Sequence, residues 1–296
     1  MEGFSTGHVD VGDTRLFVRH GGQGPPLMLL HGFPQTHWMW RHVAPRLARR
    51  FTVVCPDLPG YGASDCPASD ATHAPYAKRA MAHELIALMA CLGHRRFAVA
   101  GHDRGGRVAY RMALDHPSEV SRLAVLDVLP TLAVWERADA RMALAYWPWS
   151  LLAQPAPLPE RMLELAAQAV VDGALDGWGP ASDAFEPAVR AAYAAPLRDP
   201  AHAHAICEEY RAAATLDREH DALDRAEGRR IRCPTLVLWG KGGPLDEWYA
   251  QAGGPLGVWK EWCDELRGHP VDGGHFFPET RPGETARTLA AFFASG

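Results

Sequence analysis

An aspartate in a tight, glycine-flanked turn is the residue of this sequence best placed to act as a nucleophile. The segment Gly101-His102-Asp103-Arg104-Gly105 follows the apolar run Phe97–Ala100 and opens the helical pattern Gly105–Asp115. In a strand–turn–helix arrangement of this kind, small residues allow a sharp turn that holds the central side chain clear of the sheet. Exposed amides and the positive dipole end at the start of the next helix favour an ionised carboxylate. We therefore expect Asp103 to be a nucleophile; the alternative is that it only caps the helix.

A carboxylate nucleophile narrows the chemistry. Its attack on an ester gives an anhydride with no gain, whereas its attack on a saturated carbon displaces a leaving group and forms an alkyl ester on the enzyme. Asp103 therefore indicates opening of a carbon–halogen bond or of an epoxide.

Hydrolysis of such an ester requires a base to activate water and an acid to orient that base. The loop Gly273-Gly274-His275 supplies the base and fits the chain order nucleophile, acid, histidine. Two aspartates compete for the acid: Asp127 directly follows the apolar run Leu123–Leu126, and Asp246 lies several residues past the run Thr235–Trp239. We favour Asp127 because it directly follows its strand, although either aspartate could be a solvated loop residue.

Two further features are expected near the turn that contains Asp103. The turn His31-Gly32-Phe33-Pro34 follows another apolar run, so the backbone amides of Phe33 and Arg104 are predicted to form an oxyanion hole. Arg104 and Arg107 are three residues apart and lie on one side of the first helical turn, where cations oppose the helix dipole unless an anion is bound. A pair of guanidinium groups is suited to a substrate carboxylate, although either arginine alone could pair with a surface acid.

The elements that must position these residues are short apolar runs alternating with helical patterns. Near-continuous apolar runs are typical of strands buried on both faces of a parallel sheet, so we predict an α/β fold with a doubly wound, mostly parallel sheet. The strand rhythm stops between residues 130 and 227, which predicts an inserted helical cap between core segments 1–129 and 228–296. The expected strands are Leu16–His20, Leu27–His31, Phe51–Cys55, Phe97–Ala100, Leu123–Leu126 and Thr235–Trp239, and the expected core helices are Arg79–Leu92, Gly105–Asp115 and Gly283–Ala294.

Composition excludes several classes of function. A chain of 296 residues suits one large α/β domain with an insertion, and a formal charge of −5 gives no basic surface for nucleic acid. The six cysteines are scattered without metal-ligand spacing, so we interpret them as reduced thiols. The first ten residues do not resemble a signal peptide, and no apolar run is long enough to span a membrane. We expect a cytoplasmic enzyme that acts on a small molecule.

Taken together, these residues resemble those of the fluoroacetate or haloacetate dehalogenases, which are α/β-hydrolases. The resemblance implies Asp103 as nucleophile, Asp127 with His275 as the water-activating pair, and Arg104 with Arg107 as the carboxylate clamp. It further implies Trp149 and Tyr210 at the leaving halide, Trp178 in the pocket wall, a homodimer, and no metal or organic cofactor. Matching stretches are His31–His37, Asp57–Gly62, Gly101–Gly105, Ala124–Asp127, Trp149–Ser150, Ala153–Pro159, Cys207–Arg211 and Gly274–Phe276.

One position departs from this family. The residue before the halide-binding tryptophan is a histidine in the family but Pro148 here, and proline has no donor. Loss of a hydrogen bond to a charged group costs about 1.5 to 3 kcal/mol, and fluoride, a poor leaving group, depends most on such bonds. We therefore predict that chloroacetate and bromoacetate are better substrates than fluoroacetate.

Three alternatives remain open. An epoxide hydrolase uses the same nucleophile, base and acid with two cap tyrosines, for which Tyr146, Tyr193 and Tyr210 are available, but the arginine pair has no evident role on a neutral epoxide. A haloalkane dehalogenase would carry tryptophan after the nucleophile, where this chain has Arg104. A non-catalytic carboxylate-binding protein of the same fold would typically lack a member of the triad.

Overall fold

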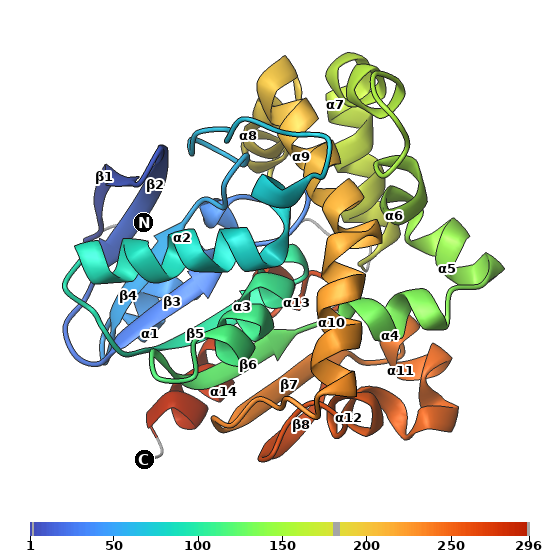
Figure 1. The fold of residues 1–296 in the computed structure, drawn as a ribbon. Coiled ribbons are helices and arrows are strands. Elements are labelled where there is room, and N and C mark those ends of the chain that lie inside the picture. Colours follow the sequence, from blue (N-terminus) through green and yellow to red (C-terminus); the bar gives the residue numbers. More distant parts are fainter. Residues whose placement is uncertain (2, 180–183, 295–296) are drawn as a thin grey trace.

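A single eight-stranded sheet forms the centre of the molecule (Figure 1). The structure, a computed structural model, describes residues 1, 3–179 and 184–294. The strand order is β1-β2-β4-β3-β5-β6-β7-β8; β1 pairs antiparallel with β2 and β2 with β4, and all later neighbours are parallel. The strands are β1 Ser5–Val11, β2 Thr14–Gly21, β3 Pro26–Leu30, β4 Thr52–Pro56, β5 Phe97–His102, β6 Val120–Leu126, β7 Thr235–Gly240 and β8 Leu266–Val271.

Helices cover both faces of the sheet, which explains the continuous apolar runs of its central strands. Successive residues of β3 face opposite sides: Met28 and Leu30 pack with α2 (Lys78–Cys91) and α3 (Arg104–Asp115), whereas Leu27 and Leu29 pack with α1 (Ala44–Leu47) and α14 (Pro282–Ala294). Every residue of β5 is buried. Burial on both faces therefore selects apolar side chains at every position rather than at alternate ones.

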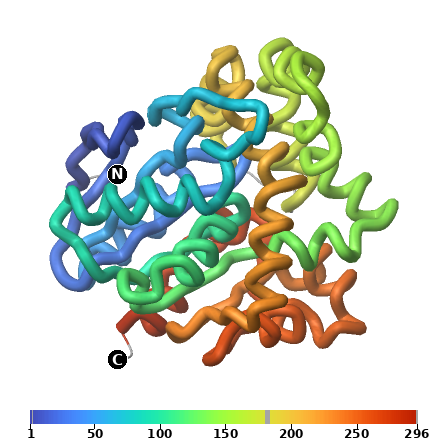
Figure 2. Tube along the Cα trace, viewed as in Figure 1, coloured from blue at the N-terminus to red at the C-terminus, as the bar shows by residue number. Residues whose placement is uncertain are grey.

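A group of helices is inserted in the chain between β6 and β7, and it lies to one side of the sheet (Figures 1 and 2). These helices fall within the interval 130–227 expected for an insertion, here called the cap; its status as a domain stays a prediction. They are α4 Thr131–Glu136, α5 Ala140–Ala145, α6 Trp147–Leu151, α7 Leu158–Gly177, α8 Pro187–Leu197, α9 Pro200–Ala214 and α10 Leu216–Ala226.

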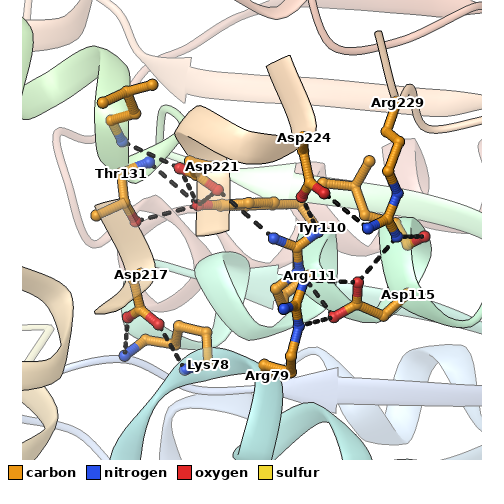
Figure 3. A network of polar contacts seen from close by, with 12 residues as sticks. Lys78, Arg79, Tyr110, Arg111, Asp115, Thr131, Asp217, Asp221, Asp224 and Arg229 are labelled. Atoms are coloured by element: carbon orange, nitrogen blue, oxygen red, sulfur yellow. Dashed lines mark hydrogen bonds and ion pairs between the residues drawn. The ribbon is translucent and has the colours of Figure 1, made fainter. Parts of the chain in front are cut away.

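Buried charges fasten the returning helix α10 to the core (Figure 3). Asp217 accepts a hydrogen bond of 2.8 Å from the amide of Lys78 and lies 3.5 Å from its ammonium group. Asp221 accepts from the Tyr110 hydroxyl at 2.9 Å, and Asp224 pairs with Arg111. These partners belong to α2 and α3, so α10 is held along both core helices.

Two strands were missed by sequence inspection, and the reason is their composition. Only one residue of β1, Val11, is buried. In β8 the sequence Leu266-Arg-Gly-His-Pro-Val271 is interrupted by two charged or polar side chains, has only Val271 buried, and contains proline, which is tolerated at a sheet edge. Edge strands face solvent, so they carry no continuous apolar run.

Within the described ranges, no helix has the length and apolar character needed to cross a membrane, and no cluster of three or more potential metal ligands occurs. All six cysteines are free thiols.

Candidate active site

Sheet register brings the two central aspartates to the same edge. In the pairing of β5 with β6, His102 lies opposite Leu126, and each strand is followed directly by an aspartate. The amide of Asp103 donates to the Leu126 carbonyl at 3.2 Å, and the amide of Asp127 donates to the Leu238 carbonyl at 2.7 Å. Asp103 and Asp127 therefore sit side by side at the carboxyl ends of parallel strands, where ligands bind in open α/β sheets.

The backbone at Asp103 adopts φ 45° and ψ −116°, an uncommon conformation for a residue with a side chain. Close packing around it requires glycine: a Cβ atom added to Gly32 would lie 2.5 Å from the Asp103 Cβ, and one added to Gly105 would lie 2.4 Å from the His31 carbonyl oxygen. A Cβ on Gly101 would lie 2.3 Å from the Gly105 oxygen. The absence of side chains at these glycines leaves room for the strained backbone conformation of Asp103.

The carboxylate of Asp103 accepts a hydrogen bond of 3.0 Å at Oδ2 from the amide of Phe33. Burial favours its neutral form, but nearby His275, Arg104 and Arg107 outweigh burial and hold the Asp103 pKa below its ordinary value. The amide of Arg104, at the first position of α3, is one of those without a partner inside a helix. Asp103 is thus an ionised carboxylate beside the predicted oxyanion-hole amides.

Asp127, rather than Asp246, is the partner of His275. The Nδ1 atom of His275 lies 2.6 Å from Asp127 Oδ2, and the amide of Gly240 donates to Asp127 Oδ1 at 2.7 Å. Asp246 instead accepts hydrogen bonds of 2.9 Å from the Trp239 indole and the Gly242 amide. The contact with Asp127 assigns the histidine proton to Nδ1, which leaves Nε2 as the base.

Opposing effects set the proton affinity of His275. Burial lowers its pKa, but the hydrogen bond and charge of Asp127, together with Asp103, raise the pKa above the ordinary value. Behind it, His102 places Nε2 2.8 Å from the His275 carbonyl oxygen, and burial followed by the charge of His275 lowers the pKa of His102 to about 4. His102, which was not predicted as a site residue, is therefore a neutral support that fixes the backbone of the base.

A small cavity joins these groups to the cap. Asp103, Asp127, His275 and Arg107 lie on its core side. The predicted cap residues Pro148, Trp149, Trp178 and Tyr210 also line the cavity, and so do Tyr146, Met142, Val134, Val128, Leu245, Trp248 and Tyr249. All of the latter except Tyr146 were missed by the sequence analysis, and two of them, Leu245 and Trp248, belong to α11 (Pro244–Trp248), which no sequence pattern placed near the cap.

The two arginines after the nucleophile differ in their surroundings. Arg104 is fully buried and directs Nε to both carboxylate oxygens of Glu209, at 2.8 and 2.9 Å. Arg107 lines the cavity, and its Nη1 donates to the Leu129 carbonyl at 2.8 Å and to the Thr131 hydroxyl at 3.2 Å. Among the described residues no carboxylate forms an ion pair with Arg107, so it is a buried cation with only neutral partners.

Glu209 is a further residue that sequence inspection passed over, although it lies in the stretch Cys207–Arg211. It also accepts a hydrogen bond of 2.9 Å from the Tyr61 hydroxyl and pairs with Lys78. The charge of Arg104 is thereby balanced inside the protein, and its Nη1 atom is buried without a partner in the described part of the chain.

The cap aromatics contact the site mainly through their ring faces. The guanidinium carbon of Arg107 lies 4.3 Å from the Trp149 ring centroid, and that of Arg104 lies 4.1 Å from the Tyr210 ring centroid. The Trp178 indole donates to the Ala145 carbonyl at 2.7 Å, so its N–H is already used. Tyr193 donates to Glu279 at 3.0 Å and does not line the cavity, unlike Tyr146 and Tyr210.

This fold and its strand-end aspartate, histidine and acid define the class: the family model for the α/β hydrolase fold matches residues 25–282. The chain belongs to the α/β-hydrolases and, within them, to the fluoroacetate and haloacetate dehalogenase family. It is 45% identical over 295 residues to a fluoroacetate dehalogenase from Burkholderia sp, a match that covers 99% of this chain and 95% of that protein.

Two solved structures are also similar over nearly the whole chain. One is a protein assigned as an α/β hydrolase from Nostoc sp PCC 7120, with a TM-score of 0.93 and 43% identity, covering 99% of this chain and 98% of that one. The other is a mutant of a protein assigned as an epoxide hydrolase from Pseudomonas aeruginosa, with bound MFA. It has a TM-score of 0.93 and 42% identity, and the match covers 100% of this chain and 97% of that one.

Proposed function

We propose that this protein hydrolyses short 2-haloacids, converting a haloacetate and water to glycolate, halide and a proton. One observation carries the proposal: an ionised aspartate nucleophile and a histidine–aspartate pair share a cavity with Arg107, a buried cation whose partners are neutral. Burying a cation is costly unless an anion accompanies it, so the cavity favours an anionic substrate. The likeness to a fluoroacetate dehalogenase supports the same substrate class.

The proposed reaction has two steps. With the substrate carboxylate beside Arg107 and near the unpaired Nη1 of Arg104, Asp103 attacks the carbon that bears the halogen. The carbon–halogen bond breaks, its electron pair leaves with the halide, and a glycolyl ester forms on Asp103. His275 then removes a proton from water, whose oxygen attacks the ester carbonyl of Asp103. The amides of Phe33 and Arg104 stabilise the tetrahedral oxyanion, and its collapse releases glycolate.

Cap residues supply the donors for the departing halide. The indole N–H of Trp149 and the hydroxyl of Tyr210 are suited to an anion in a cavity with little water. Pro148 lines the same wall and donates nothing. Fluoride forms the strongest hydrogen bonds of the halides and loses most, so we propose that chloroacetate and bromoacetate react faster than fluoroacetate.

Halide release from fluoroacetate, chloroacetate, bromoacetate and 2-chloropropionate tests the reaction and the order of halides. Faster turnover of fluoroacetate than of chloroacetate would refute the proposed order, and no halide release from any of them would refute the function.

Intact-protein mass spectrometry of His275→Asn after incubation with chloroacetate tests the intermediate. The variant should accumulate one glycolyl adduct, which peptide mapping places on Asp103, whereas Asp103→Ala should remain unmodified. A protein that only binds carboxylates would show no adduct in either variant.

A further inference from the structure

Two tyrosines from different parts of the cap line the cavity that contains the nucleophile. Tyr146 precedes α6, Tyr210 belongs to α9, and both line the cavity that contains Asp103. Within residues 1, 3–179 and 184–294, neither hydroxyl has a hydrogen-bond partner. Tyr61, Tyr76, Tyr110 and Tyr193, by contrast, each donate to a protein oxygen. Tyr249 lines the same cavity, and its hydroxyl also has no partner among the described residues. Buried tyrosines usually find such a partner, so unpaired hydroxyls gathered in one cavity indicate that a ligand contacts them.

These hydroxyls stay protonated at neutral pH. Burial, followed by the charges of Asp127 and Asp103, raises the pKa of Tyr146 well above its ordinary value. Burial also raises the pKa of Tyr210 and outweighs the opposing charge of Arg104, while the charge of Asp103 adds to the increase. Tyr249 lines the cavity too, but the charges that act on it are those of Arg107, Arg137 and Asp139, not that of Asp103. Tyr146 and Tyr210 are therefore the two proton donors close to the nucleophile.

A halide leaves without a proton, whereas the oxygen of an epoxide leaves as an alkoxide that must be protonated. Two tyrosines in the same cavity as a carboxylate nucleophile meet this need, and Pro148 is not involved in it. The buried cation Arg107 disfavours a neutral epoxide in the same cavity, because its hydrogen-bond partners are neutral and a neutral substrate would bring no anion to pair with it. An epoxide that carries its own carboxylate satisfies both the tyrosines and the arginine.

We propose that this cavity also hydrolyses short epoxides bearing a ring carboxylate, of which oxirane-2-carboxylate is the smallest, to the corresponding dihydroxy acid. This inference shares its nucleophile, base and anion site with the proposed function and adds Tyr146 and Tyr210 as acids. Oxirane-2-carboxylate has only one non-hydrogen atom more than chloroacetate. Its leaving oxygen is attached, as the halogen is, to the carbon next to the carboxylate.

The atoms balance as follows. Asp103 attacks the ring carbon next to the carboxylate, the carbon–oxygen bond breaks, and its electron pair stays on the oxygen, which takes a proton from Tyr146 or Tyr210. His275 activates water to hydrolyse the ester, and the proton released in that hydrolysis restores the tyrosine hydroxyl. The net reaction adds one water to the epoxide and gives glycerate.

The test measures glycerate formed from racemic oxirane-2-carboxylate by the wild-type protein, with Asp103→Ala and buffer alone as backgrounds. We expect Tyr146→Phe and Tyr210→Phe each to lower kcat/KM for the epoxy acid by about 10- to 100-fold. Tyr146→Phe should lower kcat/KM for chloroacetate by no more than about fivefold, because a halide needs no proton. Tyr193→Phe removes the same atom from a cap tyrosine outside the cavity and should change neither rate.

The outcomes separate this inference from the proposed function. Turnover of chloroacetate without any glycerate from the epoxy acid overturns the inference alone, and glycerate without halide release overturns the proposed function alone. Undiminished glycerate formation by the Tyr146→Phe, Tyr210→Phe double variant would show that neither tyrosine protonates the epoxide oxygen, and it would overturn the inference. Hydrolysis of propylene oxide as fast as that of the epoxy acid contradicts the requirement for a carboxylate.

Discussion

The two sides of the cavity are held in different ways. On the core side, directional bonds from the backbone fix the reacting groups: the Phe33 amide binds Asp103, and the Gly240 amide binds Asp127. On the cap side, Trp149 and Tyr210 meet the core through ring faces against guanidinium groups. Strand ends and glycine turns thus hold the reacting groups by directional bonds, whereas the cap presents an aromatic wall with few directional bonds to the core.

Removal of the nucleophile tests the core side most directly. Asp103→Ala should lower halide release from chloroacetate by at least about 10⁴-fold, because no other described carboxylate occupies the strained turn. Binding should persist, since Arg107 remains. Steady-state rates and tryptophan fluorescence titration with acetate measure the two effects, and activity above one hundredth of the wild-type rate would contradict the assignment.

Asp127, the acid that orients His275, is expected to have the second largest effect. Asp127→Asn should slow glycolate formation by about 10³- to 10⁴-fold, because the amide favours the wrong histidine tautomer and no longer stabilises the imidazolium. Asp246→Asn is the matched control and should have little effect, since Asp246 bonds to Trp239 and Gly242. Equal losses in the two variants would contradict the assignment of Asp127, and a larger loss in Asp246→Asn would reverse it.

On the cap side, Pro148→His sharpens the comparison. A histidine there would return a donor to the wall beside Trp149, and one hydrogen bond to a charged group is worth about 1.5 kcal/mol or more. The ratio of kcat/KM for fluoroacetate to that for chloroacetate should therefore rise about tenfold, with the alkylation of Asp103 still dependent on the core. An unchanged ratio would show that Pro148 does not govern halide preference.

Adjacent glutamates of α9 offer a smaller test. Glu209→Gln removes the charge that balances Arg104, and we expect KM for chloroacetate to rise about fivefold with a smaller change in kcat. Glu208→Gln alters a buried neighbour that pairs with Arg211 and His73 instead, and KM should stay within about twofold. Similar KM values for chloroacetate in both variants would mean that the ion pair of Arg104 with Glu209 does not affect substrate binding.

The pH dependence should distinguish the two chemical steps. His275 must be neutral to activate water, and its pKa is raised, so glycolate formation should fall as the pH decreases through a value above 6.5. The pKa of Asp103 is lowered, so its alkylation should continue at the same pH. Rapid-quench measurements below that value should show a burst of halide equal to the enzyme concentration and a slow release of glycolate. A parallel loss of both products would contradict the separate roles.

The residue pattern alone was sufficient for the reacting groups on the core side, and the family resemblance added four cap residues that line the cavity, Pro148, Trp149, Trp178 and Tyr210. Asp103 and Asp127 could be placed because each directly follows a buried apolar strand, and parallel strands bring such ends together. The partner of Arg104 could not be anticipated, since Glu209 lies 105 residues away on a cap helix. The contribution of Trp248 and Tyr249, which follow β7, to the cavity wall could not be predicted either, because the packing of helices at a sheet edge leaves no local pattern in the sequence.

The attachment of α10 bears on how a substrate enters. Asp217, Asp221 and Asp224 bind side chains and backbone of α2 and α3, so the C-terminal helix of the cap, α10, is anchored to the core by buried polar contacts. Swinging the cap away as a rigid lid would separate these carboxylates from their buried partners on α2 and α3, which costs free energy. We therefore expect breathing motions to be local, with short helices α5 and α6 shifting over the cavity while the long returning helix stays anchored.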